Sequence, residues 1–179
     1  MTAKMTTPRG EIIVRPAKPG DARDVYELRL EALSLNPEAF AADVEQTAAA
    51  GIQLWEARLQ EFSRDQSGSV IIACSGNALV GMTGISRGHW PKTRHSGSMW
   101  GVYVRPDWRG LHIAEAIIDG CVEWAVENGL TVLTLGVVTS NVPAIRAYVN
   151  RGFSVCGVQP RVTLHDGVYV DDLLMVKLL

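Results

Sequence analysis

The stretch Val102-Tyr103-Val104-Arg105-Pro106-Asp107-Trp108-Arg109-Gly110-Leu111-His112-Ile113-Ala114 decides the fold. It begins as a strand, and a basic loop containing glycine then leads directly into a helix. Apolar residues continue at helical spacing, at Ile113, Ala116, Ile117, Gly120, Cys121 and Trp124. The first amides of a helix lack hydrogen-bond partners and lie at the positive end of the helix dipole. A loop of this kind therefore favours binding of an anion, and pyrophosphate is the expected ligand. Taken alone, the loop is more often an ordinary strand-to-helix turn that carries a solvated arginine.

A second informative segment runs from Asn141 to Phe153. Asn141 is a good helix N-cap, Pro143 suits the first turn, and Gly152 is placed to end the helix. Tyr148 follows Asn141 by seven residues, so the two side chains project from nearly the same face. Tyr148 is either a core residue with its hydroxyl bonded to a backbone group, or a proton donor to a departing thiolate.

The order of elements around these segments predicts the fold class. Strands are expected at 12–14, 70–74, 79–85, 98–104, 131–138, 153–158 and 168–178. Helices are expected from Asp21 to Asn36, and over 52–62, 113–128 and 143–150. Adjacent strands joined by hairpins, with only some crossovers, predict an α/β protein of the α+β type. Its central sheet is mixed and mostly antiparallel, with helices on both faces. Residues 1–11 are interpreted as a tail and 12–179 as a single domain.

Composition narrows the class of protein further. The chain has 179 residues, is 47% hydrophobic and 20% charged, and carries a net charge of −2, as expected of a globular protein without a bulk attraction to nucleic acid or anionic membrane. Residues 1–10 are polar and contain no apolar run, so they are not expected to form a signal peptide. The richest apolar stretch, Leu130–Val138, is too short to span a bilayer. Cys74, Cys121 and Cys156 lack metal-site spacing and are interpreted as reduced, buried thiols of a cytoplasmic protein.

Together the two segments resemble the GNAT superfamily of N-acetyltransferases. Residues 109–114 stand for the family's (Gln/Arg)-x-x-Gly-x-(Gly/Ala) pyrophosphate loop, and residues 141–153 for its second motif. Residues 29–33 and 166–171 also resemble segments of this family, and the resemblance covers roughly residues 12–179. It implies a sheet whose fourth and fifth strands splay apart to admit acetyl-CoA. Gly101 and Gly136 interrupt the two corresponding strands, as bulges or as packing glycines.

The resemblance also implies chemistry. The acetyl group of acetyl-CoA would pass directly to a primary amine in a ternary complex, with a backbone N–H of Val102 or Tyr103 stabilising the oxyanion and Tyr148 protonating the thiolate. The implied donor site consists of Val102, Tyr103, Val104, Arg109, Gly110, Leu111, His112, Ile113, Ala114, Asn141, Ala144 and Tyr148. The general base stays open among His95, Glu31, Asp172 and a chain of waters. A non-catalytic acyl-CoA sensor is the alternative function.

Three further points concern the surroundings of this site. The family has glycine where this chain has His112, and we expect the imidazole to point outward and leave the donor site intact. Trp90, Trp100 and Trp108 shape an acceptor pocket or belong to the core and interfaces. The carboxylates at 115, 119, 123 and 127 are interpreted as a solvated helix face rather than a metal site. The acceptor stays open between a small-molecule and a peptide amine, and a homodimer is possible.

Overall fold

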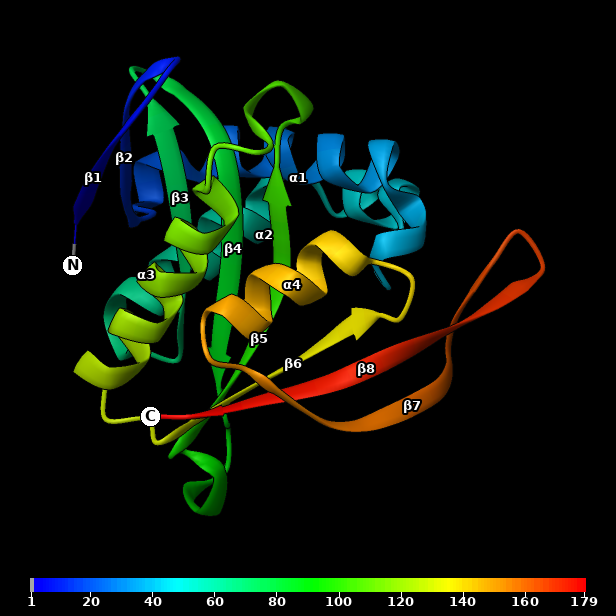
Figure 1. Ribbon diagram of the computed structural model, residues 1–179. Helices are drawn as coiled ribbons and strands as arrows, with labels where there is room; N and C mark the ends of the chain where they lie inside the picture. Colours follow the sequence, from blue (N-terminus) through cyan, green and yellow to red (C-terminus); the bar gives the residue numbers. More distant parts are fainter. Residues whose placement is uncertain (1) are drawn as a thin grey trace.

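Eight strands form one mixed sheet in the computed structural model, which describes residues 2–179 (Figure 1). The strands are β1 (Ala3–Thr7), β2 (Gly10–Pro16), β3 (Gly68–Ser75), β4 (Ala78–Arg87), β5 (Ser96–Val104), β6 (Val132–Val138), β7 (Ser154–His165) and β8 (Val168–Leu178). Their order in the sheet is β1-β2-β3-β4-β5-β6-β8-β7. Only β5 and β6 run parallel, and every other neighbouring pair is antiparallel. The predicted mixed, mostly antiparallel sheet is confirmed.

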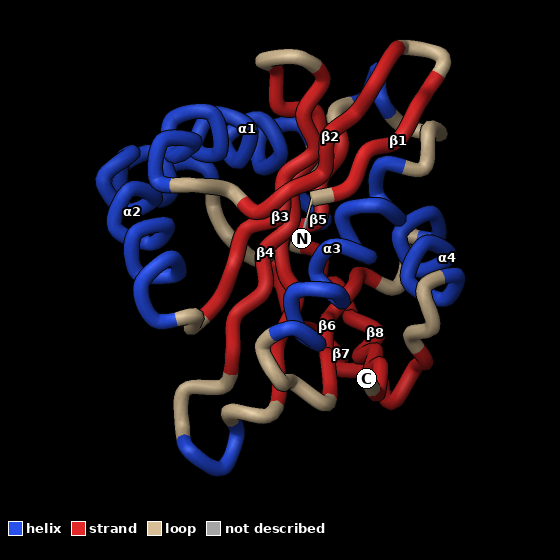
Figure 2. The backbone as a smooth tube through the Cα atoms, turned by 90° about the vertical axis from the view of Figure 1, so that its left-hand side faces the viewer, coloured by secondary structure: helices blue, strands red, loops and turns tan. Residues whose placement is uncertain are grey.

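Helices cover both faces of the sheet, as predicted (Figure 2). They are α1 (Ala22–Leu35), α2 (Val44–Asp65), α3 (Ile113–Glu127) and α4 (Val142–Asn150). Short 3₁₀ turns occur at η1 (Pro19–Asp21), η2 (Pro37–Ala39), η3 (Pro91–Thr93) and η4 (Pro106–Trp108). One buried apolar cluster lies under α3 and α4, and a second lies under α1 and α2. Among residues 2–179 no helix is both long and apolar enough to cross a membrane.

The parallel pair β5 and β6 opens into a V, and this opening positions the site. Ser96–Ser98 pair with Val132–Thr134, and beyond those three residues the strands diverge. On its other side β5 shifts register against β4 between Trp100 and Tyr103, where Gly101 has a φ of +69°. A bulge of this kind bends a strand and increases its twist. The two strands that the sequence analysis counts as the fourth and fifth are therefore the splayed pair.

The N-terminal residues depart from the prediction. Residues 1–11 were expected to form a tail, but Ala3–Thr7 pair with Gly10–Val14 as an edge strand. The Lys4 ammonium lies 3.1 Å from the Glu11 carboxylate across this hairpin. Only Met5 of β1 packs against the core, so the segment lacks the apolar alternation by which a strand is recognised. Because β1 precedes the first predicted strand, the predicted fourth and fifth strands are β5 and β6 of the structure.

Two element boundaries and one helix cap also differ from the prediction. α2 begins at Val44 rather than residue 52, because the Asp43 side chain caps it by accepting from the Gln46 amide, and Gly51 then kinks it at a φ of +71°. β7 continues beyond residue 158 to His165 through two irregularities in its pairing with β8. Asp21 precedes α1 as predicted, but its carboxylate binds Arg15 at 2.7 and 2.8 Å instead of capping the helix.

Candidate active site

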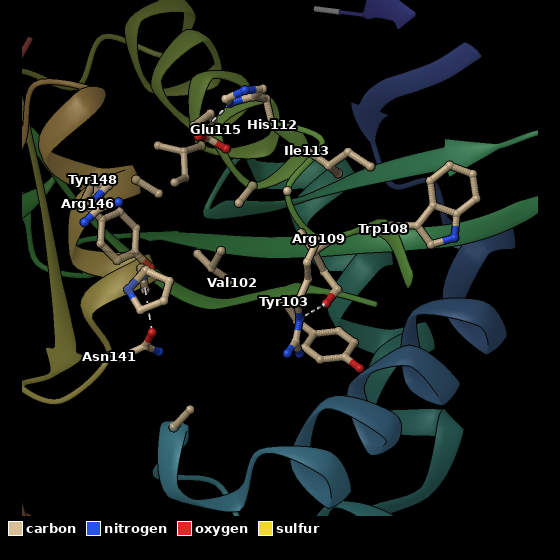
Figure 3. A pocket seen from close by; sticks show the side chains of 18 of the residues that line it. Val102, Tyr103, Trp108, Arg109, His112, Ile113, Glu115, Asn141, Arg146 and Tyr148 are labelled. Atoms are coloured by element: carbon tan, nitrogen blue, oxygen red, sulfur yellow. Dashed lines mark hydrogen bonds and ion pairs between the residues drawn. The ribbon is translucent and has the colours of Figure 1, made fainter. Parts of the chain in front are cut away.

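A cavity of about 390 Å³ lies at the splayed end of β5, between α4 and the loop that precedes α3 (Figure 3). The predicted donor-site residues that line it are Val102, Tyr103, Val104, Arg109, Gly110, His112, Ile113, Ala114, Asn141, Ala144 and Tyr148. Leu111 does not line it, because its side chain packs against the core under α3. The sequence analysis did not identify the following lining residues: Asn36, Ala39, Phe40, Glu115, Ile118, Pro143, Arg146, Ala147 and Asn150.

The loop before α3 fits a phosphate group. Gly110 and His112 both adopt left-handed backbone conformations, with φ of +77° and +59°. A Cβ added to Gly110 would meet no atom within 4 Å, so open space lies directly against the backbone there. The first amides of α3 have no partners within the helix and border the same cavity at Ile113 and Ala114. These features together are those of an anion-binding helix start.

His112 occupies the position where the family pattern has glycine, and its backbone explains that pattern. A left-handed conformation costs a residue other than glycine roughly 1–2 kcal/mol. The His112 side chain is 80% exposed, and its Nδ1 lies 3.1 Å from Glu115 Oε1. In Figure 3 the imidazole lies beside the first turn of α3, on the side away from Tyr103. The outward orientation expected from the sequence is therefore the one that the structure contains.

Two arginines approach the cavity from opposite sides. Arg109 Nε donates to the Val104 carbonyl at 3.0 Å and Nη2 to Asn36 Oδ1 at 3.3 Å, so its side chain ties the loop to β5 and to the end of α1. Arg146 is exposed and lines the cavity from α4, and no carboxylate within residues 2–179 pairs with it. The sequence analysis missed Arg146 because a single arginine on a short helix resembles any solvated residue.

Tyr148 is buried on α4 and lines the cavity. Its ring packs edge-on against Phe153 at 5.9 Å between centroids. No group in the described part of the chain accepts a hydrogen bond from its hydroxyl, so the structure does not contain the backbone bond expected of a core tyrosine. Burial raises the pKa of the phenol above its usual value, which keeps it protonated near neutral pH. As predicted, the Asn141 side chain caps α4 by accepting from the Ala144 amide at 3.2 Å.

Val102 and Tyr103 point to opposite sides of β5. Val102 faces the cavity between Tyr148 and Arg109 (Figure 3) and packs partly against the core under α3. Tyr103 belongs to the other core cluster, and its hydroxyl donates to Glu31 Oε1 at 3.0 Å. Burial, together with this hydrogen bond, raises the pKa of Tyr103 to about 12. Val102 is therefore the better placed of the two residues to contact a reacting group in the cavity.

The three side chains considered as a general base lie in different surroundings. Glu31 is occupied by Arg105, at 3.0 Å, and by the Tyr103 hydroxyl. His95 precedes β5 at the end where β6 begins, about 20 Å along the strand from Val102.

Asp172 lies on β8 opposite Val138, and its Oδ2 would be 2.9 Å from a Cβ added to Gly136 in the splayed part of β6. Burial raises the pKa of Asp172, and no group in residues 2–179 pairs with its side chain.

The cysteines are not placed as nucleophiles. Cys74 and Cys121 are buried, and burial raises the pKa of each, to about 12 for Cys121. Cys156 corrects the prediction that all three thiols are buried, because it lies exposed on β7. A nucleophilic cysteine is activated by a lowered pKa, and the two shifts here run in the opposite direction.

A buried cation lies immediately behind the cavity. Arg29 of α1 is 9% exposed, and its Nη1 is fully enclosed without a hydrogen-bond partner in the described chain. The guanidinium stacks on Phe40, 4.8 Å from the ring centroid, and Nη1 would be 3.2 Å from a Cβ added to Gly101. Burial, and secondarily Arg58, lowers the pKa of Arg29 to about 10. Enclosing an unpaired ion costs several kcal/mol, whereas a cation–π contact contributes at most about 2 kcal/mol.

The remaining side chains singled out in the sequence take mixed roles. Trp108 lines the cavity, Trp100 packs against Trp55 at 6.2 Å in the second core cluster, and Trp90 is exposed. On the acidic face of α3, Glu115 contacts His112, and the Asp119 carboxylate lies 3.1 Å from Arg151. Residues 2–179 contain no group of three His, Cys, Asp or Glu side chains that could hold a metal ion.

Comparisons with known proteins agree with this geometry. The model of the acetyltransferase (GNAT) family matches residues 23–153. The L-amino acid N-acetyltransferase AaaT of Escherichia coli strain K12 is 26% identical over 170 residues, which cover 93% of this chain and 98% of that protein.

Two solved structures share the fold. A GNAT-family acetyltransferase from Streptococcus pneumoniae superposes with a TM-score of 0.84 at 23% identity, over 94% of this chain and 99% of that one. The structure of yncA from Salmonella typhimurium with its cofactor acetyl-CoA has a TM-score of 0.76 at 20% identity, over 93% of each chain. Because the family model spans most of the chain and the sheet opens where that family's sheet is expected to open, this protein belongs to the GNAT family of acetyltransferases.

Proposed function

We propose that this protein transfers the acetyl group of acetyl-CoA directly to the primary amine of a small molecule, in a ternary complex of enzyme, donor and acceptor. The observation that carries the proposal is the shape of the cavity. One continuous space is bordered by the start of α3, the splayed strand β5 and the buried phenol of Tyr148. A phosphate site, an extended wall and a proton donor thus follow one another in the order in which a coenzyme A thioester presents its parts.

The donor would bind through its phosphates at one end of this space. The amides at the start of α3 and the open backbone of Gly110 would hold the pyrophosphate, and Arg146 would add charge from α4. Arg109 would keep the loop in place through Val104 and can reach phosphate from the exposed surface. The structure of yncA, which shares this fold and was solved with acetyl-CoA, supports this assignment.

Acetyl-CoA, when bound, supplies an electrophilic thioester carbonyl and a thiol leaving group. The amide of Val102, at the bulge of β5, is the donor that we assign to the developing oxyanion. Because a bulge interrupts the ladder, the backbone there is less committed to the neighbouring strand. This arrangement needs no covalent enzyme intermediate, in keeping with cysteines whose pKa values are raised.

Tyr148 is the group that we assign to protonate the departing thiolate. Its phenol is protonated at neutral pH and its hydroxyl has no protein partner within residues 2–179, so it is free to donate into the cavity. A positioned side chain that transfers a proton in this way acts as a general acid.

Asp172 is the group that we assign to accept the proton of the acceptor amine. Leu133, Leu135 and Val137 of β6 pack into the cluster under α3, so strand alternation directs Gly136 to the α1 side. Asp172 covers Gly136 there without a partner in the described chain, whereas Glu31 is already held by Arg105. A base on the α1 side would receive an acceptor that approaches from the face opposite the donor phosphates.

A small-molecule acceptor is supported by the comparison and by the enclosure of the α1 side. The relative from Escherichia coli is named as acting on L-amino acids, and it matches almost the whole chain. η2 follows α1 and contacts β6, so it crosses over the opening between β5 and β6. Little space is left there for a folded protein substrate.

Release of free coenzyme A thiol from acetyl-CoA tests the proposal, with a panel of small primary amines as acceptors. We expect amine-dependent release, with the N-acetyl product identified by mass spectrometry. Tight acetyl-CoA binding without release with any amine would instead favour the sensor function. Equal release of coenzyme A thiol with and without amine would show that the protein hydrolyses the thioester and does not transfer the acetyl group to an amine.

A further inference from the structure

Arg29 is a buried charge for which the described chain supplies no counterion. Its side chain is nine-tenths buried and its Nη1 has no partner. It lies on α1 two residues before Glu31, but that carboxylate accepts from Arg105 and Tyr103 instead. Within residues 2–179 the Phe40 ring is the group that offsets the charge, and a ring quadrupole does so weakly.

A second cation strengthens the imbalance. Arg58 of α2 stacks over Trp55 and Trp100, at 5.1 and 5.5 Å from their ring centroids, and makes no ion pair in the described chain. Its charge acts on Arg29 strongly enough to contribute to the lowered pKa of that group. Two arginines that make no ion pair in the described chain, Arg29 and Arg58, therefore lie together on the α1 side of the cleft. An arrangement of this kind is complementary to an anionic ligand.

The position of Arg29 connects it with the reaction. Its Nη1 approaches the backbone of Gly101, which adjoins the Val102 amide that we assign to the oxyanion. Phe40, which covers the guanidinium, also lines the cavity. A ligand that enters from the α1 side therefore meets Phe40 first and Arg29 directly behind it.

We propose that the acceptor amine carries a carboxylate and that Arg29 binds this carboxylate. This inference rests on the proposed acetyl transfer and names its acceptor class. A guanidinium fork matches a carboxylate with two parallel hydrogen bonds, and the ligand would displace the Phe40 ring to make them. Gly101 lies beside Arg29, Val102 carries the amide that we assign to the oxyanion, and the two residues are about 3.3 Å apart along the strand. Few atoms of the acceptor can therefore separate its carboxylate from its amine. The α-amino acids meet this requirement.

The experiment compares acceptors that differ only in this charge. Thiol release is measured with the common L-amino acids, and the best of them is then compared with its own α-carboxamide. For the wild type we expect kcat/KM to be about 10- to 150-fold higher for the acid, the factor that corresponds to one charged hydrogen bond. The amide has the less basic amine and is the readier nucleophile at neutral pH, so chemistry alone would favour the amide.

Variants of α1 assign the preference to Arg29. Arg29→Met keeps the length of the side chain and removes the charge, so it should lose the preference for the acid, with a large loss of kcat/KM for the acid and a smaller one for the amide. Arg29→Lys should retain part of the preference. Arg23→Met is the matched control on the same helix, because the Arg23 side chain is 74% exposed and its Nη1 lies 3.9 Å from Glu27. It should behave as the wild type does.

The outcomes separate this inference from the proposed function. Equal losses for acid and amide in both Arg29 variants would make the residue structural and overturn the inference. Normal acetyl-CoA binding with turnover only of amines that lack a carboxylate would also overturn it and would leave acetyl transfer standing. Loss of acetyl-CoA binding in the wild type would instead refute the proposed function itself. If Arg29→Met fails to fold, the acid-to-amide ratio of Arg29→Lys decides.

Discussion

The hydroxyl of Tyr148 combines burial with freedom from any protein partner in the described chain, and its proposed role as a proton donor rests on this combination. Tyr148→Phe removes only the hydroxyl and keeps the ring that packs against Phe153. General acid catalysis contributes about 10²- to 10⁴-fold, so we expect a rate loss in that range. Acetyl-CoA affinity should change by less than about threefold, because one uncharged hydrogen bond contributes on the order of 1 kcal/mol.

Thiol release and calorimetric acetyl-CoA binding, measured on the same two proteins, check this expectation. Wild-type turnover by the variant under conditions where chemistry limits the rate would show that another group or a water protonates the thiolate. Parallel losses of stability and binding would show that the hydroxyl holds the fold.

Asp172 gives a prediction about pH. Its pKa is raised by burial, and only the deprotonated form can accept a proton from the amine. The rate with the wild type should therefore rise with pH through the raised pKa of Asp172, which lies above the usual value of about 3.9. Asp172→Asn should remove this limb of the pH–rate profile and lower the rate about 10²- to 10⁴-fold.

Protein stability supplies the control for this variant. A folded-state pKa above the unfolded value means that the folded protein binds more protons in that window, so the ionised side chain lowers stability as the pH rises. Asp172→Asn should therefore unfold at the same temperature as the wild type or a higher one at neutral pH. A marked loss of stability there would contradict the assignment of an unpaired carboxylate.

At the scale of elements, the loop before α3 shows how the fold accommodates a departure from the family pattern. His112 holds a left-handed backbone that glycine would adopt without strain, and its imidazole contributes only an exposed contact with Glu115. His112→Gly should relieve roughly 1–2 kcal/mol of strain and lose about 0.4–1 kcal/mol through the greater freedom of the unfolded chain. We expect a small gain in stability and little change in acetyl-CoA affinity.

Thermal unfolding and calorimetric titration of the two proteins measure both quantities. A large gain in acetyl-CoA affinity would mean that the imidazole obstructs the donor site, in contradiction to its exposed position. His112→Ala is the matched control, because alanine also removes the imidazole but keeps the strained backbone.

The elements that could be predicted from sequence are those with local signals. Asn141 and Gly152 bracket α4 through short-range backbone bonds, and the loop before α3 precedes a strong helical stripe. β1 was missed because an edge strand with one inward apolar residue has no periodicity. The first half of α2 was missed because Gly51 interrupts the pattern at the point where the helix kinks.

The parts of the site that could not be predicted depend on tertiary contact. Arg29 is one of several arginines on amphipathic helices, and only the approach of Gly101 and Phe40 shows that it is enclosed. Glu31 and Asp172 were equally plausible bases until the structure placed Arg105 beside the first. Long-range pairing of side chains leaves no trace in a single sequence.

At the scale of the whole molecule, the sheet holds the two halves of the site apart. β5 and β6 share only three paired residues, and the divergence beyond them lets a ligand contact helices on both faces. In our proposal the α3 side offers amides and Arg146 to the donor, and the α1 side offers Arg29 and Asp172 to the acceptor. The proposed direct transfer fits this division, because neither substrate would have to leave before the other enters.

Binding of acetyl-CoA to the folded protein tests the central claim most directly. A ligand at a hundredfold excess over its Kd adds about 2.7 kcal/mol to folding stability, which corresponds to a rise of about 5–11 °C in Tm for a chain of this size. Acetylated pantetheine, which lacks the pyrophosphate, should stabilise the protein much less at the same concentration. A Tm that does not move in excess acetyl-CoA, together with a calorimetric titration that shows no heat, would contradict the account.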